Sequence, residues 1–329
     1  LASGSLVRFW EFPGFDNGNS TIQNLLPSNV QRAANEFESA RIIYPTRPQK
    51  PLDRPELMRF ILSKPGPRLV ILNTVQSAAV IAHELKKCGQ ETLHLSTALA
   101  PIDRSVIVER VHRKLGSKSQ TDWTLVATSC VEAGVDFSFK TAFRESSTVT
   151  SLIQTGGRAN RHGKDNGCEI LDFRTHDSLL NKHPAFEDSR KIVDQMFDEG
   201  LMNQFPPMKL ATEAVCRELL LSAVKESSAK IQKAEADQDY KSVSRLCRII
   251  DADTRLVVVS PTTLQRLVHR EKISFVELLK NSVQLWSNKI ESLDLMPVKH
   301  HEDIYMHMTL IFLVIWRGCS HWFISMRTV

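Results

Sequence analysis

Several features are absent from this sequence, and each absence narrows the class of protein. The six cysteines lie far apart and form no CxxC pair, which is typical of thiols in a reducing compartment and disfavours disulfides or a zinc site. The most apolar stretch, LIFLVIW at 310–316, falls short of the ~20 residues that a membrane span needs. Nothing at the start of the chain resembles a signal peptide. We therefore expect a cytoplasmic protein with no membrane partner and no metal held by its own side chains.

The sequence also lacks a large excess of charge of either sign. Lys and Arg number 42 against 37 Asp and Glu, so the net charge is only +5 and permits contact with phosphates without requiring it. With 329 residues, 42% of them hydrophobic, the chain can bury at least one sizeable core. Its length suggests two domains, or one domain with an appendage.

The periodicity divides the chain into three parts, 1–67, 68–180 and 181–329. Residues 1–67 are rich in Pro, Gly and Asn, so we expect no core there and an extended linker at 45–55. Residues 181–329 show mainly helical patterns, with a strand expected only at 255–260.

The middle part alternates between short apolar runs and helical patterns. One helix places Ala78, Ile81, Ala82 and Leu85 on a single face. Strands separated by helices of this length predict an α/β fold, a parallel sheet with helices on both faces. The expected strands are 69–73, 92–96, 123–128, 140–143 and 168–173.

Ligands of such sheets bind beyond the carboxyl ends of the strands. Asn73 and Thr74 follow the first strand, and Ser96 and Thr97 follow the second. Small polar side chains at these places can donate to a phosphate, although Asn73 and Thr74 are equally typical of an ordinary helix cap.

The loop after the third strand reads TSCVEAGVD, from Thr128 through Gly134 to Asp136. A hydroxyl, a glycine that lets the backbone approach a ligand, and a carboxylate able to bind a ribose hydroxyl would couple a nucleotide to a nucleic acid. The alternative role for Asp136 is a simple cap.

The stretch SLIQTGGRANRHG at 151–163 carries the strongest signal. Arg158 and Arg161 are three residues apart and are expected on one face of a helix, so that they act on the same group. Surface arginines with this spacing commonly pair with carboxylates instead. The adjacent Gly156 and Gly157 disfavour that interpretation, since glycines weaken a helix and suit a close approach to a ligand.

Two patterns in these loops resemble helicase motifs. Q-x-x-G-R-x-x-R, which begins at Gln154, is similar to the sixth motif of superfamily 2 helicases, and the Thr128 loop resembles the fifth. Together they resemble the second RecA-like lobe of the DNA-degrading helicase of type I CRISPR systems. Ser3-Gly4-Ser5 resembles the third motif. The resemblance implies that 1–67 ends a first lobe and forms a linker, 68–180 is the second lobe, and 181–329 is an accessory region.

The resemblance also implies an activity, ATP hydrolysis coupled to movement along a nucleic acid in antiviral defence. Its partners would be single-stranded DNA (RNA is also possible), a first helicase lobe, a nuclease domain and a CRISPR surveillance complex, and the first lobe would hold magnesium. The catalytic residues would be Arg158 and Arg161, the nucleotide-binding residues Gly134, Asp136, Gln154 and Gly157, and the nucleic-acid contacts Asn73, Thr74, Ser96, Thr97 and Thr128.

The sequence departs from the family in two respects. Thr155 stands where related proteins often have Arg, which removes one charge from the sixth motif. We also find no GxxxxGK[ST] loop, no D-E box to hold magnesium and no histidine-aspartate nuclease domain. We therefore expect a C-terminal fragment or a split subunit that is inactive alone. The alternatives are a remnant that binds or scaffolds nucleic acid without catalysis, and an RNA helicase of another superfamily 2 branch.

Overall fold

The structure, a computed structural model, describes residues 7–12, 26–117, 119, 121–165, 167–180, 184–247 and 253–307. These residues form two compact units. The first comprises the chain up to His94 and from Val111 to Cys247, and the second comprises Leu95–Arg110 and the residues from Arg248 onward.

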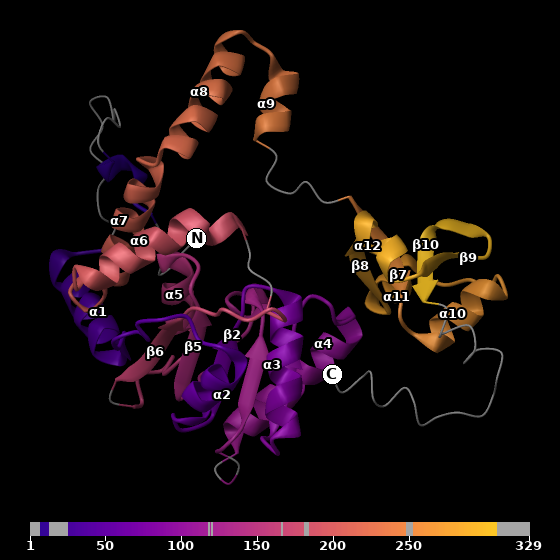
Figure 1. The fold of residues 1–329 in the computed structure, drawn as a ribbon, viewed down its shortest axis with the longest axis horizontal. Coiled ribbons are helices and arrows are strands. Elements are labelled where there is room, and N and C mark those ends of the chain that lie inside the picture. The colour runs from indigo at the N-terminus through magenta and orange to yellow at the C-terminus, as the bar shows by residue number, and fades with distance from the viewer. Residues whose placement is uncertain are drawn as a thin grey trace. The chain divides into compact units, whose positions relative to one another are not determined.

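A six-stranded sheet forms the centre of the first unit (Figure 1). The strand order is β1-β6-β5-β2-β4-β3, and the pairings β1–β6, β6–β5, β5–β2 and β2–β4 are parallel. The predicted α/β fold with helices around a parallel sheet is therefore confirmed. The strands are β1 (Ile42–Ile43), β2 (Arg68–Ile71), β3 (Thr92–Leu95), β4 (Thr124–Ala127), β5 (Thr141–Glu145) and β6 (Cys168–Phe173).

Helices precede, separate and follow these strands. The α-helices are α1 (Ser28–Arg41), α2 (Arg54–Leu62), α3 (Val75–Lys87), α4 (Pro101–Gly116), α5 (Val149–Gly156), α6 (Glu187–Asp198), α7 (Pro207–Leu219), α8 (Ser222–Ala236) and α9 (Tyr240–Leu246). The short 3-10 helices are η1 (Phe9–Glu11), η2 (Ser129–Val131), η3 (Pro184–Phe186) and η4 (Leu201–Asn203). The helical character expected after residue 180 thus holds for 184–247.

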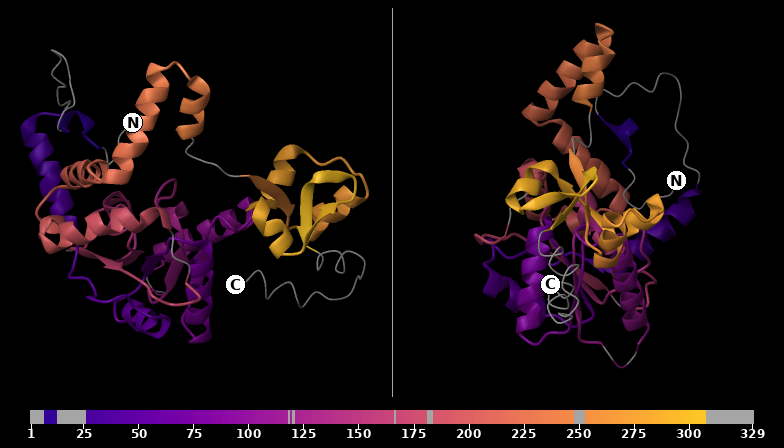
Figure 2. Two further views of the ribbon diagram at one scale, coloured as in Figure 1. Left: turned by 45° about the horizontal axis from the view of Figure 1, so that its top comes forward. Right: turned by 90° about the vertical axis from the view of Figure 1, so that its right-hand side faces the viewer.

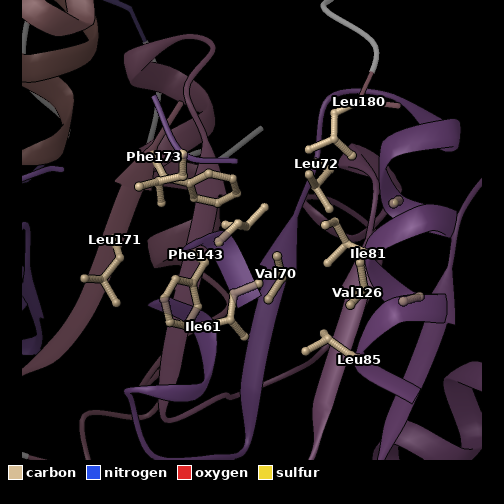
Figure 3. Packing of buried hydrophobic residues seen from close by; sticks show 14 residues of the cluster. Ile61, Val70, Leu72, Ile81, Leu85, Val126, Phe143, Leu171, Phe173 and Leu180 are labelled. Atoms are coloured by element: carbon tan, nitrogen blue, oxygen red, sulfur yellow. The ribbon is translucent and has the colours of Figure 1, made fainter. Parts of the chain in front are cut away.

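One face of the sheet is covered by α2 and α3 (Figure 3). Val70 and Leu72 alternate with residues that point to the opposite face, as the period of a strand requires. Ile81 and Leu85 of α3 pack onto them with no exposed surface. The helical face that the sequence predicted is therefore the buried face of α3.

The expectation that no core begins before residue 67 is wrong. Leu57 and Ile61 of α2 are fully buried in this same cluster, and β1 is a strand of the sheet. The stretch interpreted as a linker contains a helix start instead. The Asp53 side chain accepts a hydrogen bond from the backbone of Glu56 at 2.8 Å, and the Glu56 carboxylate accepts one from the backbone of Asp53 at 3.1 Å, which together form a capping box. Pro55 stands in the first turn of the helix.

The second unit has a four-stranded sheet in the order β8-β7-β10-β9, drawn in orange and yellow in Figure 2. The strand expected at 255–260 is β7, but the expectation of a single strand in this part of the chain is wrong. The elements are β7 (Thr254–Val258), α10 (Pro261–Val268), α11 (Phe275–Lys280), β8 (Ser282–Trp286), α12 (Ser287–Ser292), β9 (Leu295–Val298) and β10 (His301–His307). Runs such as SVQLW and LMPV are too short and too mixed to be told from helix by periodicity.

Two expectations lie outside the described residues, namely the third-motif assignment of Ser3-Gly4-Ser5 and the character of the apolar run at 310–316. Within the described part of the chain, no helix is both long and apolar enough to cross a membrane. The cysteines of that part are free thiols.

Candidate functional site

The two arginines of the glycine-rich stretch lie beyond helix α5, so their expected placement on one helical face is wrong. Helix α5 begins at the cap Thr148, whose hydroxyl accepts from the Ser151 backbone at 3.1 Å. It ends at Gly156, and the chain then turns tightly, with the Arg158 backbone donating to Thr155 at 2.9 Å. Adjacent glycines favour such an end because they stabilise a helix poorly.

Both arginines contact the same segment of the chain, the loop that follows β4. The guanidinium of Arg158 donates to the carbonyl of Glu132 at 2.8 Å and to that of Val135. Arg161 forms an ion pair with Asp136 at 2.8 Å. The glycine-rich stretch and the Thr128 loop are therefore one structural site in the first unit.

The environments of the two arginines differ. Burial lowers the pKa of the Arg158 guanidinium, and the nearby charge of Arg161 lowers it further. Arg158 nevertheless remains a cation. Arg161 has an exposed side chain, and so does its partner Asp136. An exposed pair of this kind contributes at most ~1 kcal/mol. Arg158 is thus held more firmly than Arg161, which can exchange its partner at little cost.

The other predicted nucleotide-binding residues lie around this pair. Gly134 is exposed and has a φ of 79°, in the left-handed region that favours glycine. Gln154 is exposed on α5, and Gly157 caps the end of that helix. Thr155 is fully buried and its hydroxyl donates to the Ser151 carbonyl at 2.8 Å. Its side chain is therefore part of the packing of α5.

Three of the predicted nucleic-acid contacts meet at the carboxyl ends of neighbouring strands. Ile71 of β2 pairs with Ala127 of β4, which places Asn73 and Thr74 beside Thr128. Thr74 caps α3 by accepting from the Ser77 backbone at 3.1 Å, so its ordinary role as a helix cap is realised. Thr128 is buried.

The remaining two, Ser96 and Thr97, follow β3 and belong to the second unit. Ser96 is fully buried and Thr97 is exposed.

A buried charge cluster beside these loops was not predicted. Arg144 of β5 forms an ion pair with Glu132 at 2.9 Å, and its Nη1 donates to the Asn73 side chain at 2.6 Å. Glu145 accepts from the Asn73 backbone at 2.8 Å. The cluster therefore joins β5 to the loops that follow β2 and β4. An Arg-Glu pair at the end of an apolar strand, as in TAFRES, was the available signal.

Burial shifts the titration of this cluster. It raises the pKa of Glu132 and of Glu145, and the charge of Arg144 opposes both shifts. On the neighbouring strand β6, burial raises the pKa of Asp172 to about 7, although Arg47 lies 3.4 Å away. The ion pair thus offsets only part of the cost of burying that carboxylate.

No group of three or more His, Cys, Asp or Glu in the described ranges could hold a metal ion. What the site offers is permanent positive charge, with backbone and hydroxyl donors at the ends of parallel strands. This combination is suited to a phosphorylated ligand. A parallel sheet with these two motifs in one site is what the resemblance to the second RecA-like lobe of a superfamily 2 helicase implied.

Comparison with known proteins gives the same result. Residues 64–164 match the family model described as the CRISPR-associated nuclease/helicase Cas3, C-terminal. The Cas3 of Methanothermobacter thermautotrophicus is 25% identical over 232 residues, which are 67% of this chain and 28% of that protein. The Cas3 of Haloferax volcanii is 39% identical over 80 residues, 23% of this chain and 8% of that protein. The chain therefore spans less than a third of the length of these relatives.

Solved structures show the same fold. The crystal structure of T. fusca Cas3 with ATP has a TM-score of 0.57 and 13% identity over 81% of this chain and 39% of that one. A CRISPR RNA-guided surveillance complex in a pre-nicking state contains a chain with a TM-score of 0.53 and 13% identity, over 81% and 40% of the two chains. The family model and the curated relatives confirm the resemblance that the fifth and sixth motifs indicated, and the solved structures confirm the fold alone.

Proposed function

We propose that this chain is the C-terminal part of an ATP-dependent helicase or translocase of type I CRISPR defence. The observation that carries the proposal is the convergence of Arg158 and Arg161 on the Glu132–Asp136 loop. The similarity to Cas3 over 64–164 supports the family of the parent enzyme.

The chemistry assigned to the arginines is stabilisation of phosphoryl transfer. The transferring γ-phosphoryl group spreads negative charge over its oxygens, and a planar guanidinium matches that charge with two parallel donors. Arg161 leaves Asp136, Arg158 leaves the carbonyls of Glu132 and Val135, and both guanidinium groups bind the phosphates of ATP. The released Asp136 then binds a ribose hydroxyl. Gln154 and the backbone at Gly134 and Gly157 complete the nucleotide contacts.

ATP itself is held by a first lobe together with magnesium, and this chain contributes the opposing face. The bound nucleotide draws the two lobes together, and the loops that follow the β-strands then shift along the bound nucleic acid. Hydrolysis of ATP releases the lobes from each other. The nucleic acid is single-stranded DNA, or RNA, contacted through its backbone by Asn73, Thr74, Ser96, Thr97 and Thr128. Exposure favours Thr97 as a direct contact.

The wider partners we propose are a nuclease domain and a CRISPR surveillance complex, in the cytoplasm. One observation favours a second candidate, a nucleic-acid-binding remnant without catalysis. Thr155, where related proteins often have Arg, is fully buried and its hydroxyl donates to the Ser151 carbonyl at 2.8 Å, so this position of the sixth motif brings no charge to the nucleotide.

Reconstitution distinguishes the two candidates. The chain is mixed with its cognate first helicase lobe, and ATP turnover is measured with and without single-stranded DNA. The proposal predicts DNA-stimulated turnover only when both parts are present. Binding of DNA without any turnover in the mixture would support the remnant instead.

A further inference from the structure

Arg41, the last residue of α1, contacts the arginine-bearing stretch from outside both helicase motifs. Its Nη1 donates to the carbonyl of Gly156 at 2.9 Å and to that of Ala159 at 2.6 Å. Its side chain is only 6% exposed, and Nη2 pairs with Glu38 one turn earlier. The last carbonyls of a helix have no partner within that helix, so a buried guanidinium at this point fixes the end of α5.

The contact is reciprocal. The side-chain amide of Asn160 donates to the Arg41 carbonyl at 3.3 Å and to the Asp165 carbonyl at 2.7 Å. Asn160 has a φ of 42°, an unusual conformation for a residue other than glycine, and these bonds hold it there. The backbone between Arg158 and Arg161 is thereby tied to the end of α1.

A second residue of α1 contacts the same stretch. A Cβ added to Gly163 would lie 2.6 Å from the ring of Phe37, so the chain passes directly under that ring. Gly163 also has a φ of 60°. Helix α1 therefore braces the stretch at Gly156, at Ala159–Asn160 and at Gly163.

We propose that Arg41 is a positioning residue, which sets the backbone that presents Arg158 and Arg161 to the nucleotide. The inference rests on the proposed function, because it assigns Arg41 to the catalytic role given to those two arginines. Arg41 itself touches backbone carbonyls and not the substrate. Loss of Arg41 should lower the rate of the chemical step more than the affinity for ATP. The reason is that misplaced Arg158 and Arg161 side chains stabilise the transition state less, while binding of the ground state changes little.

The decisive variant is Arg41→Lys, which keeps the charge but replaces the planar fork with a single ammonium. Arg68→Lys is the matched control. Arg68 is also buried and also donates to a backbone carbonyl, that of Lys64 at 2.6 Å, but it stands at the opposite end of β2 from the candidate site. A second variant, Glu38→Gln, removes the ion pair and leaves the carbonyl contacts of Arg41 in place.

The variants are made in this chain and tested together with its cognate first lobe, beside Arg158→Ala and Arg161→Ala. Turnover per folded molecule, KM for ATP and amide hydrogen exchange of residues 157–163 are measured. We expect Arg41→Lys to lower kcat at least tenfold with KM changed less than threefold, and to speed exchange of 157–163 about tenfold. Arg68→Lys and Glu38→Gln should change kcat less than twofold.

Two failures can be told apart. If Arg158→Ala and Arg161→Ala leave turnover intact, the proposed function is wrong. Separately, unchanged amide hydrogen exchange of residues 157–163 in Arg41→Lys would show that Arg41 does not order these residues. If those two variants abolish turnover while Arg41→Lys behaves like Arg68→Lys, the proposed function stands and the positioning role is overturned.

Discussion

The ion pair between Arg144 and Glu132 gives a quantitative prediction for stability. The side chains of Arg144 and Glu132 are 1% and 8% exposed. Removing one member of a buried pair leaves a desolvated charge and typically costs about 3–5 kcal/mol. We therefore expect Arg144→Met to lower the free energy of unfolding by about that amount, with the loss of the bond to Asn73 included.

A matched variant separates burial from the mere loss of an ion pair. Arg68 pairs with Asp122 at 2.7 Å and is itself 5% exposed, but Asp122 is 69% exposed and stays hydrated when it loses its partner. Arg68→Met should therefore cost clearly less than Arg144→Met, by at least about 2 kcal/mol.

Urea unfolding at pH 5 and pH 8 provides the assay. Without Arg144, the already raised pKa of Glu132 rises further, so Glu132 can bind a proton and the penalty should be smaller at pH 5. Adding Glu132→Gln to Arg144→Met should recover part of the loss. Equal costs for Arg144→Met and Arg68→Met, independent of pH, would refute this reasoning.

Three further predictions concern other parts of the first unit and the chain as a whole. Because burial holds the pKa of Asp172 near 7 against an ordinary 3.8, the folded state binds more protons than the unfolded chain between these values. The stability that this group contributes is present below pH 4 and is lost as the pH rises to 7, by at most about 4 kcal/mol. Asp172→Asn lacks this loss, so its free energy of unfolding should rise relative to that of the unmodified chain between pH 4 and pH 7. A difference that stays constant with pH would contradict this prediction. The chain alone should not hydrolyse ATP, and steady-state turnover that Arg161→Ala abolishes would refute this. It should bind single-stranded DNA weakly, with an affinity that falls with salt by a slope of about 0.7 per phosphate neutralised and with little dependence on sequence, as fluorescence titration would measure.

The parallel sheet could be predicted because its strands are short, mainly apolar runs. Runs such as RLVI and TLVA are buried along their full length and are separated by helices with a clear apolar face. Strand β1 could not be found in the same way. It has two residues, and the start of α2 after it depends on a capping box within a stretch rich in proline.

The candidate site was only partly predictable for a similar reason. The motif spacing indicates Arg158 and Arg161, but the way they meet the Thr128 loop depends on the turn after Gly156, which a helical extrapolation misses. The contact of Arg41 with Gly156 joins residues 115 positions apart. No local pattern encodes such a contact, so only the folded chain reveals it.

The central claim is that Arg158 and Arg161 act on the transferring phosphate. The most direct measurement compares ATP turnover and melting temperature for the alanine and lysine variants of each arginine, in the chain reconstituted with its first lobe. The account predicts a loss of turnover of about a thousandfold for alanine, with lysine still low and nucleotide affinity much less affected. Variants that melt earlier but keep the turnover of each folded molecule would contradict it, because the arginines would then serve only the fold.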